Sequence, residues 1–171
     1  MNLKILTKND RQKRRKWSKM AINDITGVYF GKDRFLHVIN QPRGNPGYIS
    51  NISNTATNFR RAGMQGIIGL IAHNYLGGRI FHDLHVGDDV YIMDGFCNRK
   101  KYRIYELLQF QAIDPRSMRS DFINLDNKEI CSATDLFNRV YTGRHRLVLQ
   151  TCIKKGNNHE WGRRFLIAYP E

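Results

Sequence analysis

The segment Arg146-Leu147-Val148-Leu149-Gln150-Thr151-Cys152, near the carboxyl end of the chain, is rich in β-forming residues and predicts a strand that ends at a cysteine. A second β-forming run, at 163–169, begins with two arginines and predicts the closing strand of the fold. Far upstream, an apolar run at 66–72 ends at His73. One thiol, one imidazole and one guanidinium at the ends of three predicted strands are the parts of a cysteine acyl-transfer site.

The remaining sequence consists mostly of short β-forming runs separated by turn residues. Strands are predicted at 28–30, 35–39, 88–93 and 103–112, and helical turns at 57–64 and at 134–141, where Thr134 is the expected cap. The polar stretches 113–132 and 153–162 are predicted loops. Six to eight strands with few helices favour a closed β-barrel over a layered α/β fold.

The length of 171 residues predicts one domain, and the net charge of +13 is unevenly spread. Residues 1–20 contain eight lysines and arginines against a single acid, Asp10, and so hold about half of the excess. We therefore expect a basic tail over 1–21, followed by a globular domain over 22–171. Such a tail can bind nucleic acid, lie against an anionic membrane surface, or remain solvated.

The three cysteines, Cys97, Cys131 and Cys152, leave at least one thiol free even if two of them pair. No C-x-x-C motif is present, which argues against a zinc ribbon or a thioredoxin-like site. The longest apolar run, 66–72, is far shorter than the roughly 20 residues that cross a bilayer, and no apolar segment of a secretory signal follows the basic amino terminus. Three interpretations stay open: a cytosolic protein, a chain whose anchor is absent, or a protein held at a surface by charge or by a partner.

Cys152 has a favourable position for a nucleophile, because it ends a strand and enters a polar loop, where a reactive group is exposed. Taken singly, the same residues have ordinary interpretations: an inert buried cysteine, a core histidine and solvated arginines. His82 and His85 form an H-x-x-H pair, but no third ligand can be placed, so no metal site is expected.

The cysteine, histidine and arginine belong to a set of motifs with a fixed order and spacing along the chain. It comprises Leu149-x-Thr151-Cys152 at a strand end, a histidine 79 residues earlier, and an arginine followed by Phe165-Leu166-Ile167 12 residues later. Three further passages belong to it: Gly69-Leu70-Ile71-Ala72-His73-Asn74, Gly78-Arg79-Ile80-Phe81-His82-Asp83-Leu84 and Val86-Gly87-Asp88-Asp89-Val90-Tyr91-Ile92. Over about residues 22–171 this set resembles the sortase family.

The order of the residues also argues against other cysteine enzymes. Papain-like hydrolases place the cysteine before the histidine, L,D-transpeptidases carry a histidine and a glycine close before it, and viral chymotrypsin-like cysteine proteases have glycines around it. Two departures from the sortase pattern are Val148, where the family often has threonine, and the absence of a membrane anchor from this chain.

The resemblance implies an eight-stranded β-barrel and a cysteine transpeptidase over residues 22–171. Cys152 would attack the threonine carbonyl of an LPxTG-type sorting signal, and His73 would protonate the departing amine. Strand alternation lets only one of the two arginines face Cys152, orient the substrate and stabilise the oxyanion. Arg164 is preferred, because Phe165-Leu166-Ile167 then lies in register with the apolar run of the family, and Arg163 is the alternative, which the register of Ala168 favours. Thr151 would contact the substrate through its backbone and its hydroxyl.

The resemblance also implies partners and a location. The acyl donor would be a surface protein or a pilin that bears the sorting signal, and the acceptor would be an amine of a peptidoglycan precursor or a pilin lysine. No organic cofactor is needed. Some family members are helped by calcium, for which the carboxylates here are Asp114, Asp121, Asp126 and Glu129. The expected location is the extracytoplasmic face of the cell membrane, where residues 1–20 would lie against anionic lipid.

Two other functions stay open. The net charge and aromatic residues such as Trp17, Tyr29 and Phe59 would also suit a nucleic-acid-binding β-barrel, which would bind in a salt-dependent way without needing Cys152. A sortase-type barrel that has become an interaction module would instead contain an unreactive Cys152. Under the sortase interpretation, nucleic acid is not an expected partner.

Overall fold

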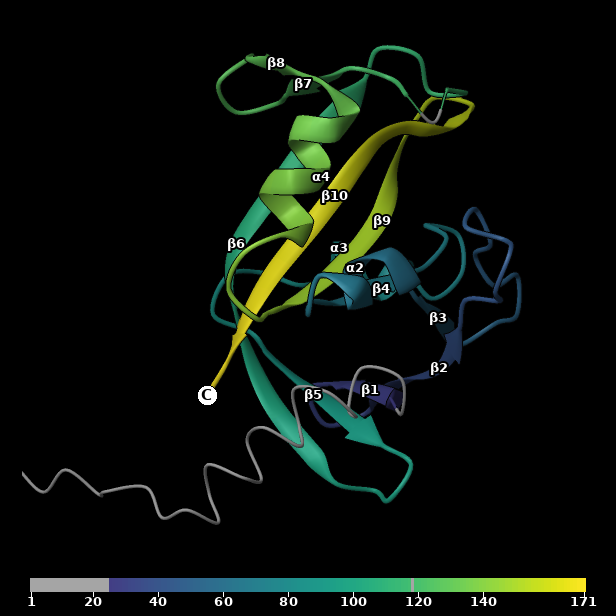
Figure 1. Cartoon of the computed structure of the whole chain (residues 1–171), viewed down its shortest axis with the longest axis vertical. Coiled ribbons are helices and arrows are strands. Elements are labelled where there is room, and N and C mark those ends of the chain that lie inside the picture. Colours follow the sequence, from purple (N-terminus) through teal and green to yellow (C-terminus); the bar gives the residue numbers. More distant parts are fainter. Residues whose placement is uncertain (1–24, 118) are drawn as a thin grey trace, which may run out of the picture.

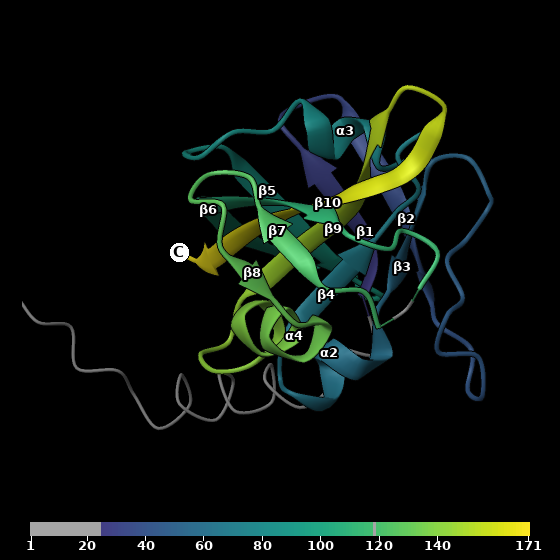
Figure 2. The ribbon, with the colours of Figure 1, turned by 90° about the horizontal axis from the view of Figure 1, so that it is seen from above.

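The computed structural model describes residues 25–117 and 119–171, which form a ten-stranded sheet. The strand order is β10-β9-β4-β3-β2-β1-β5-β6-β7-β8, and β10 also pairs with β6, so that eight strands close into a barrel (Figure 2). The strands are β1 (Ile25–Phe30), β2 (Arg34–Asn40), β3 (Thr55–Asn58), β4 (Ile68–Ile71), β5 (Asp89–Asp94), β6 (Arg99–Ala112), β7 (Phe122–Asn124), β8 (Ile130–Cys131), β9 (Leu147–Lys155) and β10 (Asn158–Pro170). The helices of this described part are α2 (Arg60–Met64), α3 (Arg79–His82) and α4 (Ala133–Tyr141).

The prediction of a closed eight-stranded β-barrel with few helices is confirmed. The predicted basic tail, 1–21, lies outside the described residues. Among the helices that are described, none combines the length and the apolar character needed to cross a bilayer.

Strands β4, β9 and β10 are apolar over long stretches because both of their faces are covered. Inner side chains, among them Leu70, Leu149 and Leu166, belong to the cluster that fills the barrel. Outer side chains such as Val148 and Ile167 join a second cluster that includes residues of α2 and α4, and α4 lies across the outside of the barrel (Figure 1). A strand buried on both faces is expected to be continuously apolar rather than alternating.

Helix α4 begins with a different cap from the one predicted. The Ser132 hydroxyl accepts a hydrogen bond from the Asp135 N–H (3.1 Å), and the Asp135 carboxylate accepts one from the Ser132 N–H (3.3 Å). This reciprocal pair is a capping box. The prediction of Thr134 as the cap is wrong, because Ser132 has the extended backbone that precedes a helix.

Three other segments differ from their predictions. Strand β3 occupies the start of the predicted helical segment 57–64, because Thr57 pairs with Ile39 of β2 on one side and with Ile71 of β4 on the other. The predicted loop 113–132 contains the short strands β7 and β8. The predicted loop 153–162 is mostly a hairpin, which turns between Lys155 and Asn158 with Gly156 at a φ of 57°. A positive φ of this kind favours glycine.

The parallel pairing of β4 and β9 places the predicted site residues at one edge of the sheet. Ile71 of β4 pairs with Gln150 of β9. Because parallel strands run in the same direction, the residues two positions further along each chain come to the same end of the barrel. Those residues are His73 and Cys152.

A partly buried histidine connects the start of β9 to the barrel interior. His145 Nδ1 lies 2.7 Å from Gly66 O, and Nε2 lies 3.0 Å from the Tyr102 hydroxyl. The neutral ring satisfies both contacts when Nδ1 carries the proton and Nε2 accepts from the tyrosine. Burial lowers the pKa of His145 below its usual 6.5, opposed by the Gly66 carbonyl and assisted by the charge of Lys100.

The free energy of unfolding is expected to fall as the pH drops below 6.5, because the unfolded chain then takes up a proton that the native His145 ring resists. Above this pH the ring is neutral in both states, and its contribution is constant. Urea unfolding between about pH 7.5 and 5.5 should show a smaller loss in His145→Gln than in the native protein. His85→Gln, at an exposed histidine, is the control. Equal losses in native protein and His145→Gln would contradict the expectation.

Candidate active site

The register of the β9–β10 hairpin decides which arginine lies beside the cysteine. Cys152 pairs with Arg163 across the two antiparallel strands, and Thr151 pairs with Arg164. Directly paired side chains point to the same face of a sheet, and faces alternate along each strand. Arg163 therefore shares a face with Cys152, whereas Arg164 shares the opposite face with Thr151.

Arg164 is directed into the fold and is 8% exposed. Its guanidinium donates to three backbone oxygens at the end of α3, those of Phe81 (3.2 Å), His82 (3.4 Å) and Leu84 (3.0 Å). The last carbonyls of a helix have no partner within the helix, and the arginine supplies one. Burial lowers the pKa of the Arg164 guanidinium. The geometry thus brings to Cys152 the alternative arginine and not the preferred Arg164.

Arg163 is held at the edge of the site by its own hairpin. Its Nη1 donates to Glu160 O (2.8 Å) and to Gly162 O (3.0 Å). The other guanidinium nitrogens make no hydrogen bond within the described residues and can donate to a substrate oxygen.

Cys152 is a free, half-buried thiol. Burial raises the pKa of this thiol, the positive charge of Arg163 opposes the rise, and the negative charge of Glu160 adds to it. The thiol is therefore mostly protonated at neutral pH. It needs a neighbouring base to become the nucleophilic thiolate.

His73 follows β4, and ring contacts hold its imidazole. The ring stacks on Tyr75, with centroids 5.1 Å apart and 19° between the planes. Tyr75 meets the His159 ring edge-on at 5.8 Å, and Asn74 Nδ2 donates to His159 O (2.9 Å). These contacts tie the loop after β4 to β10. His73 and Cys152 line the same groove.

Thr151 joins the two strand ends beneath the site. Its hydroxyl donates to Ala72 O (2.8 Å), and the residue is 1% exposed. The expected substrate contact through this hydroxyl is not supported, because the group is used inside the protein. Gly78 completes the junction: a Cβ there would lie 2.3 Å from Thr151 Oγ1 and 2.7 Å from His73 O.

His82 contacts the backbone of Cys152, although the sequence singled it out only as half of an H-x-x-H pair. Its Nε2 lies 3.1 Å from Cys152 O. His85 is exposed, and its N–H donates to the Asp88 carboxylate (2.8 Å). Within 25–117 and 119–171, no group of three or more His, Cys, Asp or Glu side chains is arranged to hold a metal ion. Neither this pair nor the acids of 114–129 considered for calcium form such a group.

The groove extends from Cys152 along the outside of the barrel towards α2 and α4, and its volume is about 790 Å³. Gln150, two residues before Cys152 on the same strand face, lines the groove, and its Oε1 accepts a hydrogen bond from the Tyr141 hydroxyl. Phe59 and Phe137 pack on Tyr141, with ring centroids 5.2 and 5.4 Å from it. The groove therefore has an aromatic wall.

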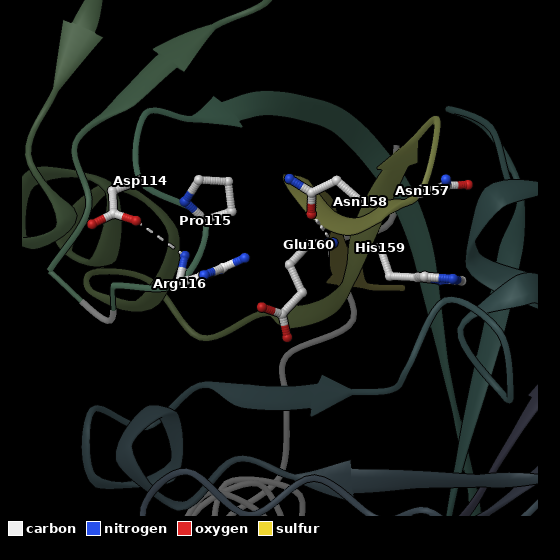
Figure 3. Close-up of a pocket in the computed structure, with 7 residues that line it drawn as sticks. All are labelled: Asp114, Pro115, Arg116, Asn157, Asn158, His159 and Glu160. Carbon is white, nitrogen blue, oxygen red and sulfur yellow. Dashed lines mark hydrogen bonds between the residues drawn. The ribbon is translucent and has the colours of Figure 1, made fainter.

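A second hollow lies between the turn at 114–116 and the tip of the β9–β10 hairpin (Figure 3). The Asp114 carboxylate is engaged in its own turn, where it accepts a hydrogen bond from the Arg116 N–H (3.3 Å). Glu160 lines both hollows, and its charge raises the pKa of Cys152. The sequence did not single out Glu160, because an acid in a polar loop carries no signal of its own.

No family model matches the sequence, and no curated protein sequence matches it. Solved structures do match. The sortase A of Listeria monocytogenes is 17% identical, with a TM-score of 0.53, covering 86% of this chain and 88% of that one. Sortase C-1 from Streptococcus pneumoniae is 15% identical, with a TM-score of 0.54, covering 85% of this chain and 66% of that one. Sortase C from Clostridium perfringens SM101 is 12% identical, with a TM-score of 0.52, covering 86% and 70%.

The chain therefore has the sortase fold. At these identities the likeness establishes the fold, and not the sortase class or the activity.

Replacement of the two arginines should have different effects on the thiol. In Arg163→Gln the pKa of Cys152 should rise further, because the opposing positive charge is removed, so iodoacetamide should alkylate the thiol more slowly at neutral pH. Arg164→Gln should leave this pH profile in place and instead lower the free energy of unfolding by about 1–3 kcal/mol, because buried carbonyls lose their donor. Mass spectrometry of the alkylated peptides over a pH series, with urea unfolding, measures both. A shifted thiol profile in Arg164→Gln alone would contradict the assignment.

Proposed function

We propose that this protein is a cysteine transpeptidase of the sortase type, which cleaves an LPxTG-type sorting signal and transfers its acyl part to an amine. One observation carries the proposal. On a sortase-fold barrel, two strand registers bring Cys152, Arg163 and His73 to one end of a groove. A nucleophile, a donor for an oxyanion and an acid–base group are the side chains that acyl transfer needs.

In the first half-reaction, the Cys152 sulfur attacks the carbonyl carbon of the threonine in the sorting signal. The thiol proton passes to His73 as the sulfur–carbon bond forms, and Arg163 stabilises the resulting oxyanion through its N–H groups. When this intermediate collapses, the threonine–glycine amide bond breaks, and His73 gives the proton to the departing amine. The product is a thioester between Cys152 and the threonine carbonyl. The raised pKa of the thiol supports a mechanism in which a base takes its proton.

In the second half-reaction, an acceptor amine attacks the thioester carbonyl. His73 takes a proton from the attacking nitrogen and returns it to the departing Cys152 sulfur. An amide bond forms as the carbon–sulfur bond breaks, and the free thiol is regenerated. His73 thus acts first as a base and then as an acid in each half-reaction.

The proposal extends to partners and location. The donor is a surface protein or a pilin that carries the sorting signal, and the acceptor is an amine of a peptidoglycan precursor or a pilin lysine. The reaction takes place at the extracytoplasmic face of the cell membrane. The sortase fold supports these assignments in general terms.

A covalent adduct tests the proposal directly. Native protein mixed with an LPxTG-type peptide should gain, by intact mass, the acyl part of that peptide on Cys152, and hydroxylamine or triglycine should remove it. Cys152→Ala should form no adduct. His73→Ala should form it about 10²–10⁴-fold more slowly, because proton transfer is lost.

Cys97→Ala is the matched control, since it removes another free thiol that lies outside the groove. Absence of an adduct across a panel of such peptides, in a folded protein whose Cys152 also reacts slowly with iodoacetamide, would overturn the proposal. That result would favour an interaction module with an unreactive Cys152. Salt-dependent retention of the protein on DNA or RNA would instead favour nucleic-acid binding.

A further inference from the structure

The groove that begins at Cys152 reaches a fixed positive charge on α2. Arg61 lines the groove, and its guanidinium carbon lies 4.3 Å from the centroid of the Phe137 ring. A guanidinium over an aromatic face is held there by the charge distribution of the ring. Among the salt bridges of the described residues, none involves Arg61.

A series of contacts connects the nucleophile to this charge. Cys152 and Gln150 lie on the same face of β9, and Gln150 accepts the hydrogen bond of the Tyr141 hydroxyl. The Tyr141 ring packs on Phe137 at 5.4 Å, and Phe137 carries Arg61 on its face. The aromatic wall therefore leads from the thiol at one end to the guanidinium at the other.

The position of α2 along β4 gives the length of this path. Ala62, the residue after Arg61, packs against Gly69, where an added Cβ would lie 2.8 Å from Ala62 Cβ. Gly69 precedes His73 by four residues, and a strand advances about 3.3 Å per residue, so the helix backbone beside Arg61 lies roughly 13 Å along β4 from the catalytic end. An extended peptide in the groove covers this distance with about four residues.

The other charged residues that line the groove do not neutralise the positive charge of Arg61. They come in equal numbers of each sign: Arg119 and Arg163 against Asp121 and Glu160. Arg163 and Glu160 both act on the pKa of Cys152 and so lie at its end of the groove. Arg61 is left as an excess positive charge at the opposite end.

We propose that Arg61 selects acyl donors that carry a carboxylate side chain at the fifth residue before the cleaved bond, which is the residue directly before the LPxTG-type motif. The inference rests on the proposed function, because it assigns a specificity determinant to the same site. The part of the donor before the cleaved bond stays attached to Cys152 as the thioester, so it is the part that occupies the groove. A carboxylate there would complete an ion pair with a guanidinium that is already positioned.

Fluorescent LPxTG-type peptides that carry Glu, Gln or Lys at the residue directly before the motif, and are otherwise identical, test the selection. The binding readout uses Cys152→Ala, and the rate readout uses thioester formation by the protein with its cysteine intact. The Glu peptide should be preferred over the Gln peptide by about 2–5-fold, which is the range of a partly exposed ion pair. The preference should weaken as salt is added.

Arg61→Gln should abolish this preference, and Arg61→Glu should reverse it in favour of the Lys peptide. Arg144→Gln is the matched control, because the Arg144 guanidinium also lies over an aromatic ring, that of Tyr169 at 5.3 Å, but does not line the groove. It should leave the preference unchanged. Circular dichroism checks that each variant is folded.

The outcomes separate this inference from the proposed function. Equal binding of the three peptides to Cys152→Ala overturns the assignment of Arg61, while thioester formation would still support the transpeptidase. Charge-dependent binding that Arg61→Gln abolishes, in a protein that forms no thioester, supports Arg61 as a peptide-binding residue and overturns the transpeptidase. No binding by any peptide overturns both.

Discussion

The parallel pairing of β4 with β9 is the constraint on which the site depends. It brings a histidine and a cysteine, 79 residues apart in the chain, to the same edge of the barrel. The Thr151 hydroxyl fixes the junction by donating to Ala72 O, and glycine is required at position 78 because no side chain fits against it. Both strands are buried on both faces, so a slip of one residue would exchange core and outer side chains and cost much of the apolar packing. The relative position of His73 and Cys152 therefore depends on the packing of the core between these strands.

Two adjacent arginines on β10 serve different purposes because faces alternate along a strand. Arg163 projects beside the thiol, where its charge favours the thiolate and its donors are open to an oxyanion. Arg164 projects inward and binds the carbonyls at the end of α3. That helix in turn carries His82, whose ring contacts the Cys152 carbonyl. One arginine therefore acts on the thiol through space, and the other supports the backbone that holds it.

The barrel could be predicted from the sequence, because it depends on local β-forming character and on the resemblance, and the structure places Cys152 and His73, the two residues singled out with it, in one groove. The choice between the arginines could not. It depends on the pairing of β9 with β10 as a hairpin, in which Cys152 lies opposite Arg163, and counting residues from Cys152 through a segment predicted as a loop does not give that pairing. The sequence did not predict a role for Glu160 or Arg61, because a charged residue in a polar segment carries no motif. Only the fold shows that both line the groove.

The most direct test of the site as a whole is the rate of the first half-reaction in the two arginine variants. Thioester formation in a single turnover should be slower by about 10²–10³-fold in folded Arg163→Gln, because a donor to the oxyanion is lost. In folded Arg164→Gln the rate should stay within a few-fold of the native value, since that side chain points away from the thiol. A native rate in Arg163→Gln together with a large loss in Arg164→Gln would contradict the placement of the site on this face of the sheet.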